Sequence, residues 1–496
     1  MSNPKTKSNP AAPPEVHGGW VHKCDVDEYT GRHLPIPTQV VSNEEFIPPP
    51  QTRKQKMVEH RLNAMVDRYS KRLGVDRRGF LRTASGMATA FGAMNSVFGK
   101  YFEVDEAEMY DPQAAQEANE RRDYFIFDIQ THHVAAGRNI PSLLGYRRAA
   151  RAWNPEMLKS RFQMDDLYLE NYIKEIFLDS ETDMVVISGF PSPTDNTNIL
   201  PPDQMVKTRG WINQLTSSQR VISHGLMSPD LGTRNLEAMQ VQAEKLKIDA
   251  WKGYPGQPLG PRKDGWWLDD EKEAFPVLQY SQKIGIRNIC VHKGLPLAGF
   301  NVEHCEPKDI YKAALTFPKL NFLVYHSAFK SVEDGLPIAE SDFKTTYIPW
   351  TSDICAWKKK NPKVNNVYME LGSTFGMMVI SHPKLCCYVL GTILDAFGED
   401  HVLWGTDSIW WGSPQWQIQA LKRLQMPDDL MKRFGFKPLT PQVKAKIFGL
   451  NSARIYRVDP EAKRNAIPSD YIDRLRKLYN AVGNNPSHTQ YGWIKA

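Results

Sequence analysis

Short apolar runs alternate with helix-like segments from about residue 123 onward. Amphipathic stretches such as residues 166–180 and 235–247 lie between them. Continuous apolar runs separated by helices are typical of buried parallel strands. Eight strand–helix units over residues 123–460 therefore predict an α/β fold, a (β/α)8 TIM barrel. The eight expected strands are residues 124–130, 183–190, 220–226, 248–254, 288–294, 321–327, 366–372 and 401–407.

The segments on either side of the predicted barrel lack this alternation of apolar runs and helices. Residues 1–75 are polar and Pro-rich, and we interpret them as an arm in which residues 54–74 can form a charged helix. Residues 461–496 predict a C-terminal helix and a polar tail. Two long connections, 255–275 and 328–365, follow expected strands, so we expect them to form a lid or a subunit contact over the catalytic face.

Residues 76–122 form a further segment and a linker. Arg77 and Arg78 are followed by Gly-Phe-Leu-Arg and then by a weakly apolar run rich in Ala, Gly and Met. This pattern resembles a twin-arginine export signal, although no clear small-x-small cleavage site follows it. The resemblance implies a periplasmic protein. The alternative is a cytoplasmic protein that retains the segment as a helix packed on the domain or on a partner.

Composition narrows the possible functions. The chain of 496 residues has 62 Lys and Arg against 56 Asp and Glu, and its net charge of +6 is too weak for a nucleic-acid platform. No run of about 18 apolar residues occurs, so no membrane-spanning helix is expected. Six cysteines in so long a chain are not a disulfide scaffold, and we expect most of them to be buried thiols.

Polar side chains end four of the expected strands: His132, His292, His326 and Asp407. The C-terminal ends of barrel strands converge on one site, so these side chains are expected to meet. Imidazoles and a carboxylate suit a divalent transition metal such as Zn²⁺, which lowers the pKa of a bound water. Asp407 would then orient that water or take its proton, and His326 would polarise a substrate oxygen.

Five short motifs in this order resemble the amidohydrolase superfamily, in the group that includes aminocarboxymuconate-semialdehyde decarboxylase. They are DIQTHH, VHKG, YHSAF, LWGTD and KAKIFGLNSARIY, within residues 124–457. The resemblance implies one divalent ion, Zn or else Mn or Fe, held by His132, His292 and Asp407. It also implies that His326 is the catalytic imidazole.

Gln130 is the main departure from that pattern, because it stands where the group's first strand has a histidine ligand. An amide oxygen binds Zn²⁺ more weakly than imidazole does. His133 is not expected to replace it, since adjacent side chains on a strand point to opposite faces. The metal would thus have three ligands, be held weakly or be absent. Lys252 and Glu370, also at strand ends, are candidate substrate-binding residues, with Lys252 as a point charge for a carboxylate.

Three functions remain open from the sequence. The first is a metal-dependent hydrolase that acts on an amide, ester or lactone of a small carboxylated or cyclic substrate. The second is a non-oxidative decarboxylase of an aromatic or unsaturated acid. The third is a metal-free binding or structural subunit. We also expect a homo-oligomer in which the N-terminal arm contacts a neighbouring subunit.

Overall fold

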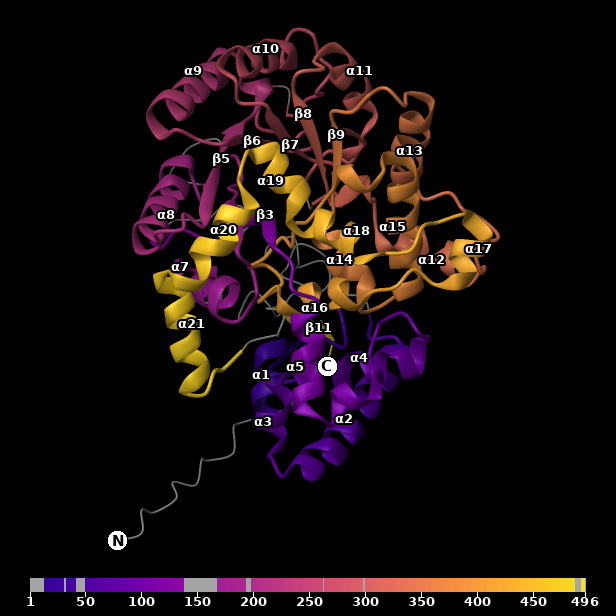
Figure 1. The fold of residues 1–496 in the computed structure, drawn as a ribbon. Helices are drawn as coiled ribbons and strands as arrows, with labels where there is room; N and C mark the ends of the chain where they lie inside the picture. Colours follow the sequence, from indigo (N-terminus) through magenta and orange to yellow (C-terminus); the bar gives the residue numbers. More distant parts are fainter. Residues whose placement is uncertain are drawn as a thin grey trace.

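Eight parallel strands form one sheet whose order follows the sequence (Figure 1). The computed structural model describes residues 13–30, 33–41, 50–137, 167–192, 198–261, 263–297, 299–486 and 492–495. The first strand meets the chain after the last one through a parallel bridge between Thr131 and Ser408, which brings the ends of the sheet together. The predicted (β/α)8 barrel is therefore confirmed. Its strands are β3 Phe127–Thr131, β4 Met184–Ile187, β5 Val221–Met227, β6 Ala250–Gly253, β7 Asn288–His292, β8 Asn321–Tyr325, β9 Val367–Glu370 and β10 Val402–Leu403.

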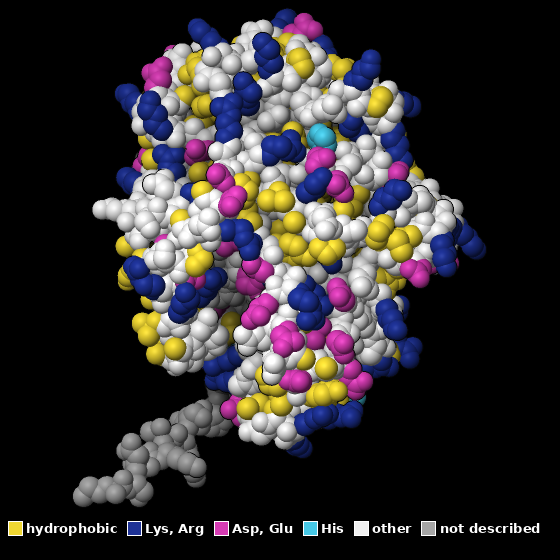
Figure 2. Space-filling view, viewed as in Figure 1, with side chains coloured by type: hydrophobic (Ala, Val, Ile, Leu, Met, Phe, Trp, Pro, Cys, Tyr) yellow, Lys and Arg dark blue, Asp and Glu magenta, His cyan; other side chains and the backbone are white. Residues whose placement is uncertain are grey.

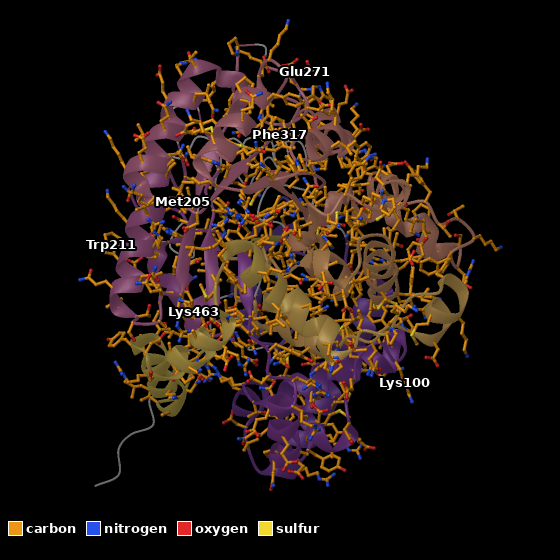
Figure 3. The ribbon with its side chains drawn as sticks, turned by 45° about the horizontal axis from the view of Figure 1, so that its top comes forward. Lys100, Met205, Trp211, Glu271, Phe317 and Lys463 are labelled. Atoms are coloured by element: carbon orange, nitrogen blue, oxygen red, sulfur yellow. The ribbon has the colours of Figure 1, made fainter. Side chains whose placement is uncertain are left out.

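Helices surround this sheet, and each turns an apolar face inward. On α8, Met205 is fully buried whereas Trp211 is 54% exposed at the rim of the molecule (Figure 3). The connection 328–365 is not a plain loop, because it contains two helices. The helices from here to the end of the barrel are α7 Leu169–Ile173, α8 Pro202–Leu215, α9 Thr233–Val241, α10 Ala274–Ile284, α11 Lys308–Thr316, α12 Val332–Glu340, α13 Thr351–Lys360, α14 Gly372–Val379, α15 Pro383–Phe397, α16 Gln415–Arg423, α17 Asp428–Phe434, α18 Pro441–Ala445 and α19 Asn451–Tyr456.

The described residues of an N-terminal extension, 13–30, 33–41 and 50–122, form a largely helical layer against one side of the barrel (Figure 1). Its strand β2 pairs with β1 on one side and with the C-terminal strand β11 on the other, so the described ends of the chain share a small sheet. The charged helix expected at 54–74 is α2. The elements outside the barrel are β1 Val16–His17, β2 Trp20–His22, α1 Lys23–Thr30, α2 Arg53–Leu73, α3 Arg77–Leu81, α4 Ala84–Phe98, α5 Pro112–Glu120, α20 Pro460–Ala466, α21 Tyr471–Ala481 and β11 Trp493–Lys495.

The segment with the twin-arginine pattern belongs to this packed layer. Phe80 is fully buried and Phe91 is 1% exposed, and both lie in the same apolar core as barrel residues. The Arg77 guanidinium donates to Asn63 and pairs with Asp67, while Arg82 donates to Asn485 near the C-terminus. The segment is thus a helix packed on its own chain, and export through it stays a prediction.

One buried ion pair attaches the extension to the barrel. Glu108 and Arg423 of α16 are 2% and 1% exposed, and Glu108 Oε2 lies 2.7 Å from Arg423 Nη1. Burial is the largest single influence and would raise the pKa of Glu108. However, the Arg423 guanidinium, the Asp105 backbone N–H and the Arg122 charge together lower this pKa. The pair therefore stabilises the fold above the ordinary glutamate pKa and loses that effect as the pH falls through the lowered pKa.

Glu108→Ala is expected to lower the free energy of unfolding by about 3–5 kcal/mol at pH 7, because Arg423 would remain buried and unpaired. Urea unfolding followed by circular dichroism measures the change. Glu117→Ala, at an exposed position of α5, is the matched control and should cost about 0.5 kcal/mol or less. The difference between wild type and Glu108→Ala should shrink in acid. A loss below about 1 kcal/mol at pH 7 would contradict this role.

The surface charge, the helix lengths and the state of the cysteines match what the composition led us to expect. On the face shown in Figure 2, basic and acidic side chains are interspersed. Within the described ranges, every helix is too short or too polar to span a membrane. All six cysteines are free thiols, and five of them are buried, as expected.

Candidate active site

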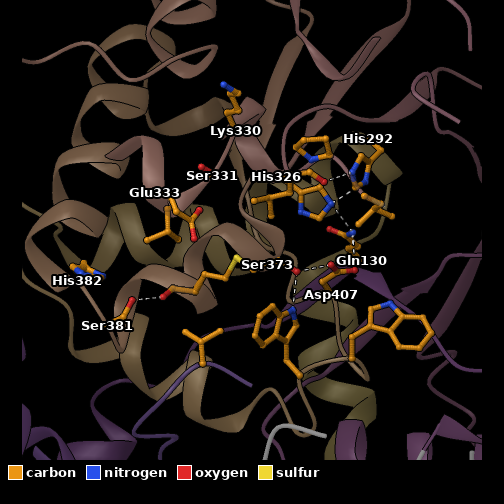
Figure 4. A pocket seen from close by; sticks show the side chains of 18 of the residues that line it. Gln130, His292, His326, Lys330, Ser331, Glu333, Ser373, Ser381, His382 and Asp407 are labelled. Carbon is orange, nitrogen blue, oxygen red and sulfur yellow. Dashed lines mark hydrogen bonds between the residues drawn. The ribbon is translucent and has the colours of Figure 1, made fainter. Parts of the chain in front are cut away.

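A cavity of about 450 Å³ opens at the C-terminal ends of the barrel strands. The predicted strand-end residues line it together: Gln130, His132, His292, His326 and Asp407 (Figure 4). They come from β3, β7, the end of β8 and the turn after β10, because parallel strands of one barrel all end on the same face. The predicted convergence of these side chains is therefore found in the structure.

Asp407 is the centre of the hydrogen-bond network. Gln130 donates its amide N–H to Asp407 Oδ1 at 2.8 Å, and His132 Nε2 lies 3.0 Å from the same oxygen. Ser373 donates its hydroxyl to Oδ2 at 2.5 Å. Burial alone would raise the pKa of Asp407, but these bonds and the nearby imidazoles hold it well below its usual value. The carboxylate is therefore ionised at neutral pH.

Ser373 and Trp411 are site residues that the sequence analysis missed. Trp411 Nε1 lies 2.7 Å from Ser373 Oγ. An indole N–H only donates, so Ser373 must accept this bond and direct its own proton to Asp407. Trp411 thus fixes the Ser373 hydroxyl, and Ser373 fixes one oxygen of the carboxylate.

Backbone carbonyls determine which nitrogen of two imidazoles carries a proton. His132 Nδ1 lies 2.7 Å from the Ser188 carbonyl oxygen, and His292 Nε2 lies 3.0 Å from that of Leu295. A carbonyl only accepts, so both of these nitrogens are protonated. Burial lowers the pKa of His292, which is therefore neutral and presents the lone pair of Nδ1 to the cavity.

His326 faces that lone pair. Its Nε2 lies 3.1 Å from His292 Nδ1, so this nitrogen of His326 is the donor. Its Nδ1 has no hydrogen-bond partner among the described residues. Burial lowers the pKa of His326 to about 4. His326 is thus a neutral imidazole with one donor nitrogen and one free acceptor nitrogen.

The donor chemistry of this network fits a divalent cation. Both His132 and His292 give their outer N–H to a backbone carbonyl, which is how metal-binding histidines are usually held. His132 Nε2 faces an ionised oxygen of Asp407, and two such groups attract each other only when a proton or a cation lies between them. In the described residues, however, no three His, Cys, Asp or Glu side chains are spaced as a metal-binding group. Hydrogen bonds join these side chains directly.

The structure does not bring Lys252 and Glu370 to the cavity. Lys252 pairs in register with Cys290, two residues below His292 on β7, so it lies inside the barrel beneath the site. Its ammonium nitrogen is 3.5 Å from the ring centre of Tyr325, and burial lowers its pKa to about 8. Direct contact between Lys252 and a substrate, which we expected, does not fit this position.

Glu370 supports the catalytic face from below. Its Oε2 accepts the backbone N–H of His326 at 3.0 Å, and burial raises its pKa to about 8. It therefore positions His326 and is not among the described residues that line the cavity. His133 points away from the cavity to Thr208, with 3.0 Å between Nε2 and Oγ1, as the alternation along a strand predicts.

The outer wall of the cavity comes from segments without a sequence motif. The connection 328–365, expected to form a lid or a subunit contact, supplies α12 with Leu336. Met377 and His382 come from α14 and the turn before α15. The N-terminal extension contributes as well, through Val40, Pro50, Thr52 and Gln55. The described part of the arm thus packs on its own chain and lines the cavity.

Comparison with known proteins agrees with this fold. Residues 243–458 match the family model described as amidohydrolase, a span with β6–β10 that includes His292, His326 and Asp407. The match, over less than half of the chain, supports an enzyme. A search of curated proteins found no match to the chain.

Solved structures give distant likenesses. A 5-carboxyvanillate decarboxylase from Sphingomonas paucimobilis is 13% identical, with a TM-score of 0.40 over 68% of this chain and 100% of that one. A 4-oxalomesaconate hydratase from Rhodopseudomonas palustris is 15% identical, with a TM-score of 0.40 over 71% and 99%. A probable 2-pyrone-4,6-dicarboxylic acid hydrolase from Acinetobacter baumannii is 9% identical, with a TM-score of 0.40 over 67% and 99%. At such scores the likenesses carry no argument about the reaction.

Proposed function

We propose that this protein is a metal-dependent hydrolase of the amidohydrolase superfamily that acts on an amide, ester or lactone of a small carboxylated or cyclic substrate. The observation that carries the proposal is the ionised Asp407 carboxylate next to two imidazoles whose tautomers are held by backbone carbonyls. His132, His292 and Asp407 would hold the ion, which we propose to be Zn²⁺, with Mn²⁺ or Fe²⁺ as alternatives.

The chain's own residues have distinct tasks in this reaction. A divalent ion in such a site supplies Lewis-acid polarisation and makes water acidic near neutral pH. Asp407 orients the attacking water and accepts its hydrogen bond. With His292 Nδ1 holding the ion in place of the His326 proton, His326 would donate its Nε2 proton toward the oxygen on which negative charge develops, and its neutral state suits a donor. Gln130 and Ser373 hold the carboxylate in place.

The charges around the cavity favour hydrolysis over decarboxylation. A Lys or Arg that holds the substrate carboxylate beside the metal would favour decarboxylation, and Lys252 was the candidate for this role. Lys252 lies beneath the site, and Lys330 is the single Lys or Arg among the described residues that line the cavity. Lys330 is part-exposed, and its Nζ lies 3.6 Å from Asp334 Oδ1 at the start of α12. Non-oxidative decarboxylation remains the second candidate.

The metal content of the purified full-length protein tests the proposal. Wild type, purified without chelator, should contain close to one Zn, Mn or Fe per chain by elemental mass spectrometry. His132→Ala should lose most of this metal, because alanine offers no nitrogen in place of the His132 imidazole that would bind the ion. His133→Ala, whose side chain points to the other face, is the matched control and should keep its metal. No metal in wild type after resupply would favour the metal-free binding subunit.

We also propose a periplasmic location and a homo-oligomer. The twin-arginine pattern at Arg77 and Arg78 supports export. Since the segment after these arginines is part of the apolar core, the exported protein would have to keep it. Immunoblotting of periplasmic and cytoplasmic fractions with wild type and Arg77→Lys/Arg78→Lys tests export, and light scattering tests the oligomer.

A further inference from the structure

We propose that the outer half of the cavity is a binding subsite for the tail of the substrate, and that the N-terminal extension forms part of it. This inference rests on the proposed function only in placing the reacting group at the Asp407 end. The tail would be mainly apolar and uncharged and would carry one hydrogen-bond acceptor, such as an ether or amide oxygen.

The size and division of the cavity are the first observation. About 450 Å³ is within the range of pockets that enclose drug-sized ligands, and it exceeds what one small acid group fills. The polar network occupies one end, around Gln130 and Asp407, while Ser381 and His382 lie at the far end of the view in Figure 4. The substrate therefore has room to extend away from the reacting group.

The chemistry of the outer wall is the second observation. Val40 and Pro50 of the extension, Leu336 of α12 and Met377 of α14 give this wall an apolar surface. Burial lowers the pKa of the His382 imidazole, and the charge of Lys54 on α2 lowers it further, so this lysine lies near the imidazole. The extension is therefore on the His382 side of the cavity. An apolar tail would gain free energy from burial against this wall.

Gln55 supplies the specific polar group. It lines the cavity, and its side chain is 3% exposed. Its Oε1 accepts the backbone N–H of Thr52 at 2.9 Å, which fixes the orientation of the amide. Its Nε2 has no hydrogen-bond partner among the described residues. A buried donor without a partner is costly, so an acceptor on the substrate tail would relieve that cost.

The charge at the mouth decides between a neutral and an anionic tail. Glu333 and Glu340 line the cavity at exposed positions of α12, and the negative charge of each acts to raise the pKa of His382. These two glutamates would repel a second carboxylate at this end of the cavity. Lys330 would attract it less strongly, because the Lys330 ammonium is already near Asp334. A neutral acceptor avoids this repulsion.

Calorimetric titration of the full-length protein with matched probes tests the subsite. The probes are benzoate, 4-pentylbenzoate, 4-butoxybenzoate and the uncharged 4-butoxybenzamide. The butoxy and pentyl groups have the same length, and only the butoxy group has an acceptor. Wild type should bind 4-butoxybenzoate about three- to ten-fold more tightly than 4-pentylbenzoate, the worth of one neutral hydrogen bond.

Two variants and one control separate the contributions. Gln55→Leu should remove the preference for butoxy and leave benzoate affinity within about two-fold, whereas Gln116→Leu on exposed α5 should change nothing. Leu336→Trp should fill the outer cavity and weaken both long benzoates at least about ten-fold, with benzoate unchanged.

An unchanged butoxy preference in Gln55→Leu, or unchanged long-probe affinity in Leu336→Trp, would overturn the subsite. If the benzoates fail to bind but 4-butoxybenzamide binds and responds to both variants, the subsite stands and the proposed reacting end fails. If 4-butoxybenzamide also fails to bind, the subsite is refuted.

Discussion

Asp407→Asn is expected to lower kcat/KM by roughly 10³-fold or more and to remove most of the bound metal, while the barrel stays folded. The substitution keeps the size of the side chain but takes away the charge that His132 and the proposed ion share. The hydrogen bonds from Gln130 and Ser373 show how closely this carboxylate is held. Loss of the charge should therefore lower the rate of the reaction and the amount of bound metal, and leave the packing of the barrel unchanged.

Three measurements distinguish this outcome from general damage. Elemental mass spectrometry should give a sub-stoichiometric metal content, and the thermal midpoint should stay within a few degrees of wild type. Steady-state kinetics on the substrate found by screening gives kcat/KM. Ser373→Ala serves as a graded control, since it removes one of the hydrogen bonds to Asp407 and keeps the charge. An Asp407→Asn variant with near-normal turnover would show that another group is the base.

The barrel and the strand-end residues could be predicted from the sequence for a simple physical reason. A buried parallel strand needs a continuous apolar run, so each of the eight strands leaves a local signal. The end of such a run is also a fixed place on the catalytic face. His132, His292, His326 and Asp407 were therefore predictable as neighbours although they lie far apart in the sequence.

The remaining parts of the site depend on information that is not local. Lys252 stands near the end of an apolar run as His292 does, but the register between β6 and β7 places it two residues lower. Ser373 bonds Asp407 directly and Trp411 acts through Ser373, and no motif or spacing in the sequence links either residue to Asp407. Gln55 reaches the cavity only because the extension folds back over the barrel, and that contact depends on packing between distant segments.

The second large effect is expected at Gly372, which joins β9 to α14 beneath the site. An added Cβ would lie 2.7 Å from His326 Nδ1, 2.8 Å from Gln130 Oε1 and 3.0 Å from Glu370 Oε2. These separations are shorter than van der Waals contact, so the imidazole and the amide would have to move. Gly372→Ala is therefore expected to lower kcat/KM by at least roughly 100-fold, because small displacements of catalytic groups are that costly.

A matched glycine separates collision from backbone strain. Gly372 has φ +47°, and Gly435 at the end of α17 has φ +73° with nothing within 4 Å of an added Cβ. Alanine at either position costs about 1–2 kcal/mol of stability from the left-handed backbone alone. Gly435→Ala should therefore lose stability in urea unfolding and keep full activity, whereas Gly372→Ala should lose both. Equal activity in the two variants would mean that His326 and Gln130 tolerate displacement, and the hydrogen-bonded geometry around Asp407 would then not be what the reaction requires.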